Sequence, residues 1–172
     1  TYRRVSDVAF ERETDLNEAC ITRLLAEMRP GPVLEVGCGR GYLARLLKER
    51  GVDITVADIV IQPSIRAMQP PIPWFEASLE ALPFADNQFD TVICTHTLEH
   101  VRNLRAAIHE LRRVAKRMLI VVPHQRPYLY SFDLHLNFFP YPHSLLAAFG
   151  KTPADAICED LDGDWFYTEE KP

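Results

Sequence analysis

Apolar residues follow two different spacings along this 172-residue chain. Short continuous apolar runs are typical of strands buried on both faces of a sheet, whereas apolar residues at every third or fourth position predict amphipathic helices. The predicted strands are 33–36, 54–57, 74–77, 89–95 and 118–122, and the predicted helices are 15–28, 42–50, 64–68, 104–114 and 144–149. Thr14 or Asp15 is expected to cap the first helix, and Asn103 the fourth.

Strands and helices therefore alternate five times along the chain. This order predicts an α/β protein with a parallel sheet, right-handed crossovers and helices on both faces. Two further short segments, 156–160 and 165–168, flank the sequence Asp162-Gly163. Because Asp-Gly is a strong hairpin signal, we expect an antiparallel hairpin at this end of the fold.

Composition adds bounds rather than a function. The length suits one domain, residues 1–172, and the apolar and charged fractions are those of an ordinary globular protein. A net charge of −5 argues against a nucleic-acid backbone or an anionic membrane as the main partner. Four widely separated cysteines without a C-x-x-C motif predict a reduced, cytoplasmic protein, as does the lack of a spanning or secretory segment. The oligomeric state stays open.

The most informative segment is the glycine-rich turn after the first strand. Glu35 lies within that strand, and Gly37, Cys38, Gly39 and Gly41 follow it before the next helix. Glycines let the backbone approach a ligand, and a helix N-terminus offers free N–H groups to it. The spacing departs from the dinucleotide fingerprint G-x-G-x-x-G, and an acid precedes the first glycine by two residues.

This E-x-G-x-G-x-G segment resembles motif I of the class I S-adenosylmethionine (SAM)-dependent methyltransferases, in particular their methyltransferase type 11-like branch. In that family the acid lies close to the methionine part of the cofactor, and the glycine backbone lies along it. The resemblance implies a Rossmann-like, seven-stranded, mostly parallel sheet with an antiparallel C-terminal hairpin. It also implies a helical cap over 1–31, a cofactor-binding core over 32–123 and a substrate side over 124–172.

Asp58 ends the second strand, 23 residues after Glu35. An acid at this point is placed to accept hydrogen bonds from both ribose hydroxyls of a nucleoside, as its counterpart does in dinucleotide folds. Ile59, the next residue, is expected to pack on the adenine ring. Both predictions depend on the ligand expected at the neighbouring glycine turn.

Two further segments carry the resemblance. Residues 77–90 resemble the family's DAExLPFxDxxFD segment, in which the first acid receives the adenine amino group and the next backbone N–H reaches the ring. In this chain these positions are Ser78 and Leu79, and a serine accepts without charge. Residues 89–101 resemble FDxVxxxxxLEHV, which places Thr95 and His96 beside the methionine and its sulfonium.

The resemblance implies transfer of a methyl group from SAM, with S-adenosylhomocysteine as product, to a small-molecule acceptor. Segment 123–143 is rich in aromatic residues, histidine and proline, which suits the wall of a small-molecule pocket. The candidates for acceptor contact are His100, His124, Tyr128, Asp133 and His135. Packing roles explain these residues equally well, and the sequence identifies no catalytic base.

Three alternative functions are also compatible with parts of the sequence. His96, Glu99 and His100 match H-x-x-E-H, the motif of a zinc hydrolase, but that motif belongs inside a helix and His96 directly follows a strand. No metal is therefore predicted. Ser78 in place of the usual acid is compatible with a non-catalytic, SAM-binding scaffold. The basic run 112–117 suits a nucleic-acid patch less well than a helix C-terminus, where cations complement the helix dipole.

Overall fold

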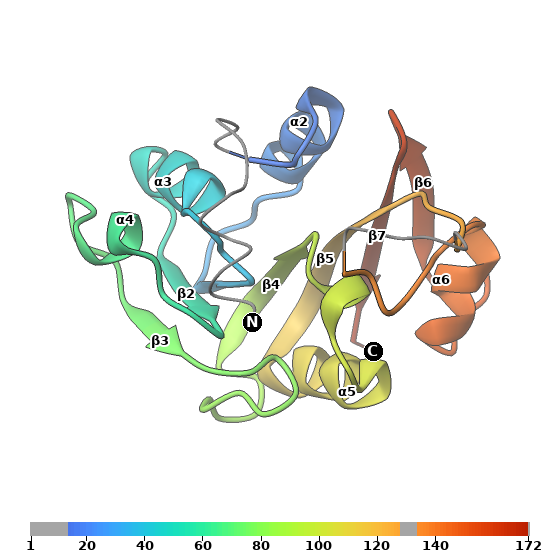
Figure 1. Cartoon of the computed structure of the whole chain (residues 1–172). Coiled ribbons are helices and arrows are strands. Elements are labelled where there is room, and N and C mark those ends of the chain that lie inside the picture. The colour runs from blue at the N-terminus through green and yellow to red at the C-terminus, as the bar shows by residue number, and fades with distance from the viewer. Residues whose placement is uncertain (1–13, 128–133, 172) are drawn as a thin grey trace.

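The computed structural model describes residues 14–127 and 134–171, which form a seven-stranded mixed sheet with helices around it (Figure 1). The strands are β1 Val33–Val36, β2 Ile54–Asp58, β3 Trp74–Glu76, β4 Phe89–Thr95, β5 Ala115–Pro123, β6 Ile157–Leu161 and β7 Asp164–Glu170. The helices are α2 Glu18–Ala26, α3 Tyr42–Glu49, α4 Pro63–Arg66, η1 Leu98–His100 (a 3-10 turn), α5 Leu104–Val114 and α6 Pro142–Ala148.

The strand order is β3-β2-β1-β4-β5-β7-β6, which confirms the predicted α/β fold. Neighbours from β3 to β5 are parallel, while β7 runs antiparallel between β5 and β6. The chain moves outward from β1 to β3 and then returns to the other side of β1 with β4. The carboxyl ends of β1 and β4 thus lie side by side at the point where strand order reverses, the usual ligand site of open α/β sheets.

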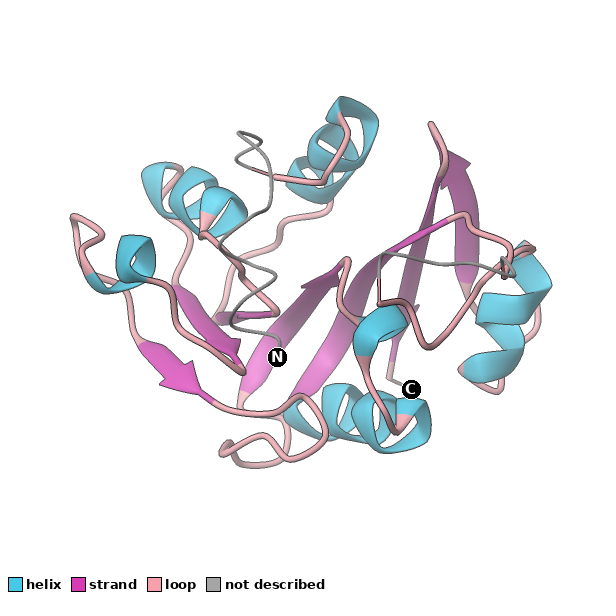
Figure 2. Ribbon diagram, in the orientation of Figure 1, coloured by secondary structure: helices cyan, strands magenta, loops and turns pink. Residues whose placement is uncertain are grey.

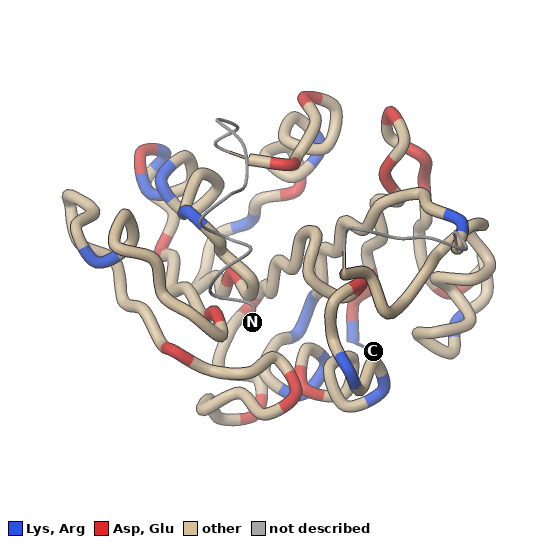
Figure 3. Tube along the Cα trace, in the orientation of Figure 1, with Lys and Arg blue, Asp and Glu red and all other residues tan. Residues whose placement is uncertain are grey.

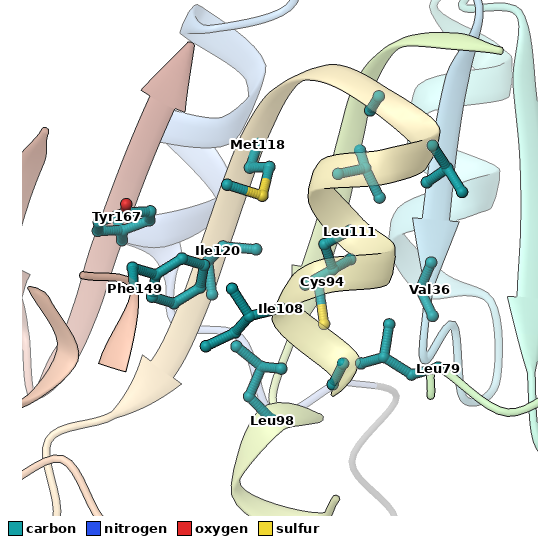
Figure 4. Packing of buried hydrophobic residues seen from close by; sticks show 14 of the residues in the cluster. Val36, Leu79, Cys94, Leu98, Ile108, Leu111, Met118, Ile120, Phe149 and Tyr167 are labelled. Atoms are coloured by element: carbon teal, nitrogen blue, oxygen red, sulfur yellow. The ribbon is translucent and has the colours of Figure 1, made fainter. Parts of the chain in front are cut away.

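Helices cover both faces of the sheet, as predicted (Figures 1 and 2). Alternate residues of β5 point to opposite faces: Met118 and Ile120 pack beneath α5, and Leu119 and Val121 belong to the core on the other face. Figure 4 shows the first of these cores, with Leu111 of α5 among its members. The second core includes residues of α2, α3 and α4.

Two elements begin three residues away from the predicted position. The first helix begins at Glu18, because Asn17 and not Thr14 or Asp15 caps it, its side-chain oxygen accepting the Cys20 N–H at 2.8 Å. The last parallel strand begins at Ala115, directly after α5, rather than at residue 118. Arg117 is therefore a strand residue, and its buried guanidinium donates to the Glu27 carbonyl at 2.6 Å.

The basic run 112–117 is engaged in ion pairs within the fold. Arg112 forms two hydrogen bonds of 2.8 Å to Glu169, Arg113 pairs with Glu110, and Lys116 pairs with Asp90. Figure 3 shows acidic and basic positions interspersed around this part of the chain.

Within the described ranges, no helix combines the length and apolar character that crossing a bilayer would require.

Candidate functional site

The glycine turn after β1 is held tightly against β2 and the loop after β4. Gly37 has φ +78°, and its N–H donates to the Ala57 carbonyl at 2.8 Å. A Cβ at Gly37 would lie only 1.9 Å from Oγ1 of Thr97. Glycine is required here because both the backbone angle and the contact exclude a side chain. The contact also brings the loop after β4 against the turn.

Farther along the turn, the backbone is open. Gly39 has φ +50°, and a Cβ there would meet no atom of the described residues within 4 Å. Its N–H donates to Oδ2 of Asp58 at 2.9 Å. α3 begins after Gly41, which provides no side-chain cap. The N–H groups of this first turn therefore lack side-chain partners from the cap position and are suited to bind a ligand.

Two acidic side chains flank this open turn. Glu35 is buried at the end of β1, and its Oε2 has no hydrogen-bond partner among the described residues. Burial, with the nearby charge of Asp58, raises the pKa of Glu35 from 4.5 to about 8. Burial also raises the pKa of Asp58, although hydrogen bonds from the N–H groups of Gly39, Val60 and Ile59 oppose this. A cation placed here would stabilise the charged form of both carboxyl groups.

The residues expected around an adenine ring have different environments. Ile59 is 58% exposed, whereas Leu79 is buried in the core. Ser78 is exposed, and its Oγ accepts the N–H of Glu80 at 3.2 Å. The hydroxyl of Ser78 thus stabilises a local turn, and its role toward adenine stays a prediction.

His96 follows Thr95 at the end of β4 and has an uncommon φ of +45°. Its Nδ1 lies 3.6 Å from Oε1 of Glu99, and its Nε2 lies 3.4 Å from Oδ2 of Asp164. Burial alone would lower the pKa of His96, but these two carboxylates outweigh burial and raise it to about 10. The ring is therefore held between two acidic side chains.

Sequence reasoning did not assign a site role to Asp164 or Asn17. Asp164 begins β7, and its Oδ2 accepts from Nδ2 of Asn17 at 2.9 Å as well as facing His96. The hairpin turn that carries Asp164 is acidic (Figure 3). These contacts join the start of α2 to the start of β7, 147 residues later, and both to the loop after β4.

The predicted acceptor residues fall into two groups. His100 and His135 come together, with ring centroids 4.8 Å apart. His124 instead contacts the hairpin: its Nδ1 lies 2.8 Å from Oδ2 of Asp160, and its ring centroid lies 4.3 Å from that of Trp165. Tyr128 and Asp133, also predicted, lie outside the described residues.

The zinc-hydrolase interpretation does not fit this geometry. Glu99 and His100 lie in the short 3-10 turn η1, and His96 lies outside it. The two histidines are therefore not one turn apart on a continuous α-helix, which the H-x-x-E-H mechanism requires.

Comparison with known proteins finds a match over the region that contains this site. A family model described as "Methyltransferase domain" matches residues 34–121, about half of the chain. The matched stretch runs from β1 to β5 and contains the glycine turn, Asp58 and the loop after β4. The chain belongs to this methyltransferase domain family.

Curated relatives extend beyond the matched region. A malonyl-[acyl-carrier protein] O-methyltransferase of Erwinia pyrifoliae is 32% identical over 114 residues, covering 63% of this chain and 43% of the relative. A 2-phytyl-1,4-naphtoquinone methyltransferase of Trichormus variabilis is 38% identical over 101 residues, covering 51% of this chain and 44% of the relative. The chain thus spans less than half the length of these relatives.

Solved structures share the fold across nearly the whole chain. A protein of Pyrococcus horikoshii has a TM-score of 0.72 at 18% identity, with 99% of this chain and 98% of that chain covered. A Burkholderia thailandensis 1,6-didemethyltoxoflavin-N1-methyltransferase has a TM-score of 0.69 at 18% identity, with 90% and 77% covered. At this identity the likeness concerns the arrangement of strands and helices.

Proposed function

We propose that this chain binds SAM and transfers its methyl group to a small-molecule acceptor. The observation that carries the proposal is the buried carboxyl of Glu35, with its unpartnered Oε2, beside Asp58 and an open glycine turn. SAM brings a sulfonium, an ammonium and a ribose diol, which complement these two acids. Membership of the methyltransferase domain family supports the same ligand.

Each residue then has a stated role. Glu35 faces the cationic methionine part, and the backbone of Gly37, Cys38, Gly39 and Gly41 lies along the cofactor. Asp58 exchanges its bond to the Gly39 N–H for the ribose hydroxyls.

The adenine ring would lie between Ile59 and the segment that begins at Ser78, where the Leu79 N–H faces its edge. Thr95 and the backbone of His96 line the reacting end. The bound cofactor supplies an electrophilic methyl group, so the protein's main task is to hold the acceptor in line with it.

The acceptor class rests on the relatives. Their names mention malonyl-[acyl-carrier protein], 2-phytyl-1,4-naphtoquinone and ubiquinone biosynthesis, and the Burkholderia structure holds 1,6-didemethyltoxoflavin and S-adenosylhomocysteine. These acceptors differ widely, so we propose the class and not one compound. The acceptor would lie on the side of His100 and His135. Free cysteines in the described fold suit a reducing, cytoplasmic setting.

Calorimetric titration of the ligand-free protein with SAM and with S-adenosylhomocysteine tests the proposal. We expect micromolar binding of both, and formation of S-adenosylhomocysteine when a panel of phenolic, quinol, amine and carboxylate acceptors is added. Asp58→Ala is expected to weaken the binding of SAM. Asp155→Ala, at an exposed acid, is the matched control. Lack of binding to either ligand would overturn the proposal, and binding without transfer to any acceptor would favour the scaffold alternative.

A further inference from the structure

We propose that Glu99, His100 and His135 form a binding site for a divalent first-row transition-metal ion. Each residue offers one ligand atom, and these atoms all lie within 4.8 Å of one another. This is the set of described residues whose geometry suits a metal, and it departs from the expectation that no metal is bound.

The carboxylate of Glu99 is the first reason for this assignment. Its side chain is 1% exposed, and its Oε2 has no hydrogen-bond partner among the described residues. Its Oε1 lies 3.6 Å from Nδ1 of His96 and 4.0 Å from Nε2 of His100. Oε1 thus faces both histidines, and with Oε2 buried and unpartnered among the described residues, the carboxylate as a whole would be stabilised by a bound cation.

The orientation of the two histidines is the second reason. Nδ1 of His100 faces the Leu134 carbonyl at 3.4 Å, and Nδ1 of His135 is hydrogen-bonded to Oε1 of Gln125. Because a carbonyl oxygen only accepts, both contacts require Nδ1 to be the donor, so Nε2 is the ring nitrogen that we assign to the metal. Histidine ligands of metals are commonly oriented by such a bond from the other ring nitrogen.

The backbone holds the two ligand segments together. The Glu99 carbonyl accepts the N–H groups of Leu136 at 2.6 Å and Asn137 at 3.0 Å. The side-chain amide of Asn137 donates to the carbonyls of Leu98 at 2.9 Å and Val101 at 2.8 Å. These four bonds fix η1 and Val101 against residues 136–137, so that Glu99 and His100 are held beside the segment that carries His135.

The ligand set indicates the kind of metal. Two imidazoles and one carboxylate suit Zn²⁺, Co²⁺, Fe²⁺ or Mn²⁺, whereas Mg²⁺ and Ca²⁺ prefer oxygen ligands alone. Three protein ligands leave coordination positions open. Thr97 contacts Gly37 and directly precedes η1, so the open positions would lie near the proposed cofactor site. That an acceptor oxygen binds there rests on the proposed function; metal binding itself does not.

Titration of the metal-free protein with Co²⁺, followed by visible absorption, tests this site. We expect one equivalent to bind, with the bands of an imidazole- and carboxylate-ligated ion, and Zn²⁺ to displace it. His135→Gln and Glu99→Gln are each expected to weaken binding at least about tenfold. His109→Gln, at an exposed position on α5, is the matched control and should bind as the native chain does.

Several outcomes would overturn the site: no Co²⁺ binding by the native protein, equal affinity in both ligand variants and the control, or a sulfur-to-cobalt charge-transfer band. If thermal unfolding shows that His135→Gln is not folded, Gln125→Ala provides the same test, because it removes the bond that orients His135. We expect Gln125→Ala to weaken Co²⁺ binding about tenfold. SAM titrations on the same samples separate the two proposals. Co²⁺ binding without SAM binding would overturn the proposed function alone, and the reverse would overturn the metal site alone.

Discussion

The two halves of the sheet's carboxyl edge are built in different ways. The glycine-turn half, Glu35 to Asp58, uses one continuous β-α-β segment, and much of what it offers to a ligand is backbone. The histidine half joins η1 to residues separated from it by more than thirty positions, and it offers side chains. A backbone site requires particular glycines at fixed spacing and is visible in sequence. A side-chain site assembled across the chain has no such spacing.

The largest expected effect breaks the glycine-turn half sterically. Gly37→Ala forces a Cβ against Thr97 at positive φ, and we expect it to destabilise the fold by about 3 kcal/mol. Gly39→Ala, where space is open, should cost only about 1 kcal/mol in stability. Urea unfolding measures both. Equal loss in the two variants would show that crowding at Thr97 is not what requires glycine.

Substitution of Asp58 tests whether the glycine-turn half is the part of the edge that binds SAM. Asp58→Ala removes both acceptor oxygens, and we expect SAM affinity to fall about 10- to 100-fold. Asp58→Asn keeps one acceptor and should give an intermediate loss. Calorimetry measures both, with His135→Gln as the comparison from the other half. Native SAM affinity in Asp58→Ala would show that the ribose assignment is wrong.

Glu35 gives the glycine-turn half a pH dependence. Its folded-state pKa, about 8, lies above the ordinary 4.5, so the folded protein binds the extra proton between these values and stability falls as pH rises through them. Glu35→Gln removes this penalty. We expect it to unfold much like the native protein near pH 4.5 and to be about 2 kcal/mol more stable near pH 6, with the difference still growing toward pH 8. Urea unfolding at several pH values measures the difference in the free energy of unfolding between the two proteins. A difference that stays constant with pH would contradict this prediction.

The smallest effect concerns the frame of the histidine half. Asn137→Ala removes the two bonds to Leu98 and Val101, and we expect it to lower stability by about 1 kcal/mol. SAM affinity should stay within about twofold, because the described hydrogen bonds of Asn137 go to Leu98, Val101 and Glu99 and not to the glycine turn. Thermal unfolding and calorimetry on one preparation check both. A large loss of SAM affinity would show that the two halves are energetically coupled.

Prediction from the sequence succeeded where local rules decide. The alternation of predicted strands and helices predicted the parallel sheet, and Asp162-Gly163 predicted the hairpin. Both signals depend on residues that are neighbours in the sequence. Periodicity placed the start of β5 too late, since Arg117 resembles a surface cation until Glu27 is seen beside it. The grouping of Glu99 with His135, and of His96 with Asp164, comes from tertiary packing. Only the unusual density of histidines in 96–143 hinted at it.

The position of β7 has a consequence for how the chain comes to its fold during synthesis. β7 is later in the sequence than β6, yet it lies between β6 and β5 in the sheet. Until residues 164–170 have left the ribosome, β5 has an open edge, β6 has no neighbour, and His96 lacks Asp164. Unpaired strand edges invite intermolecular pairing. The nascent chain therefore carries its greatest aggregation risk just before its hairpin is complete, when the glycine turn can already be in place.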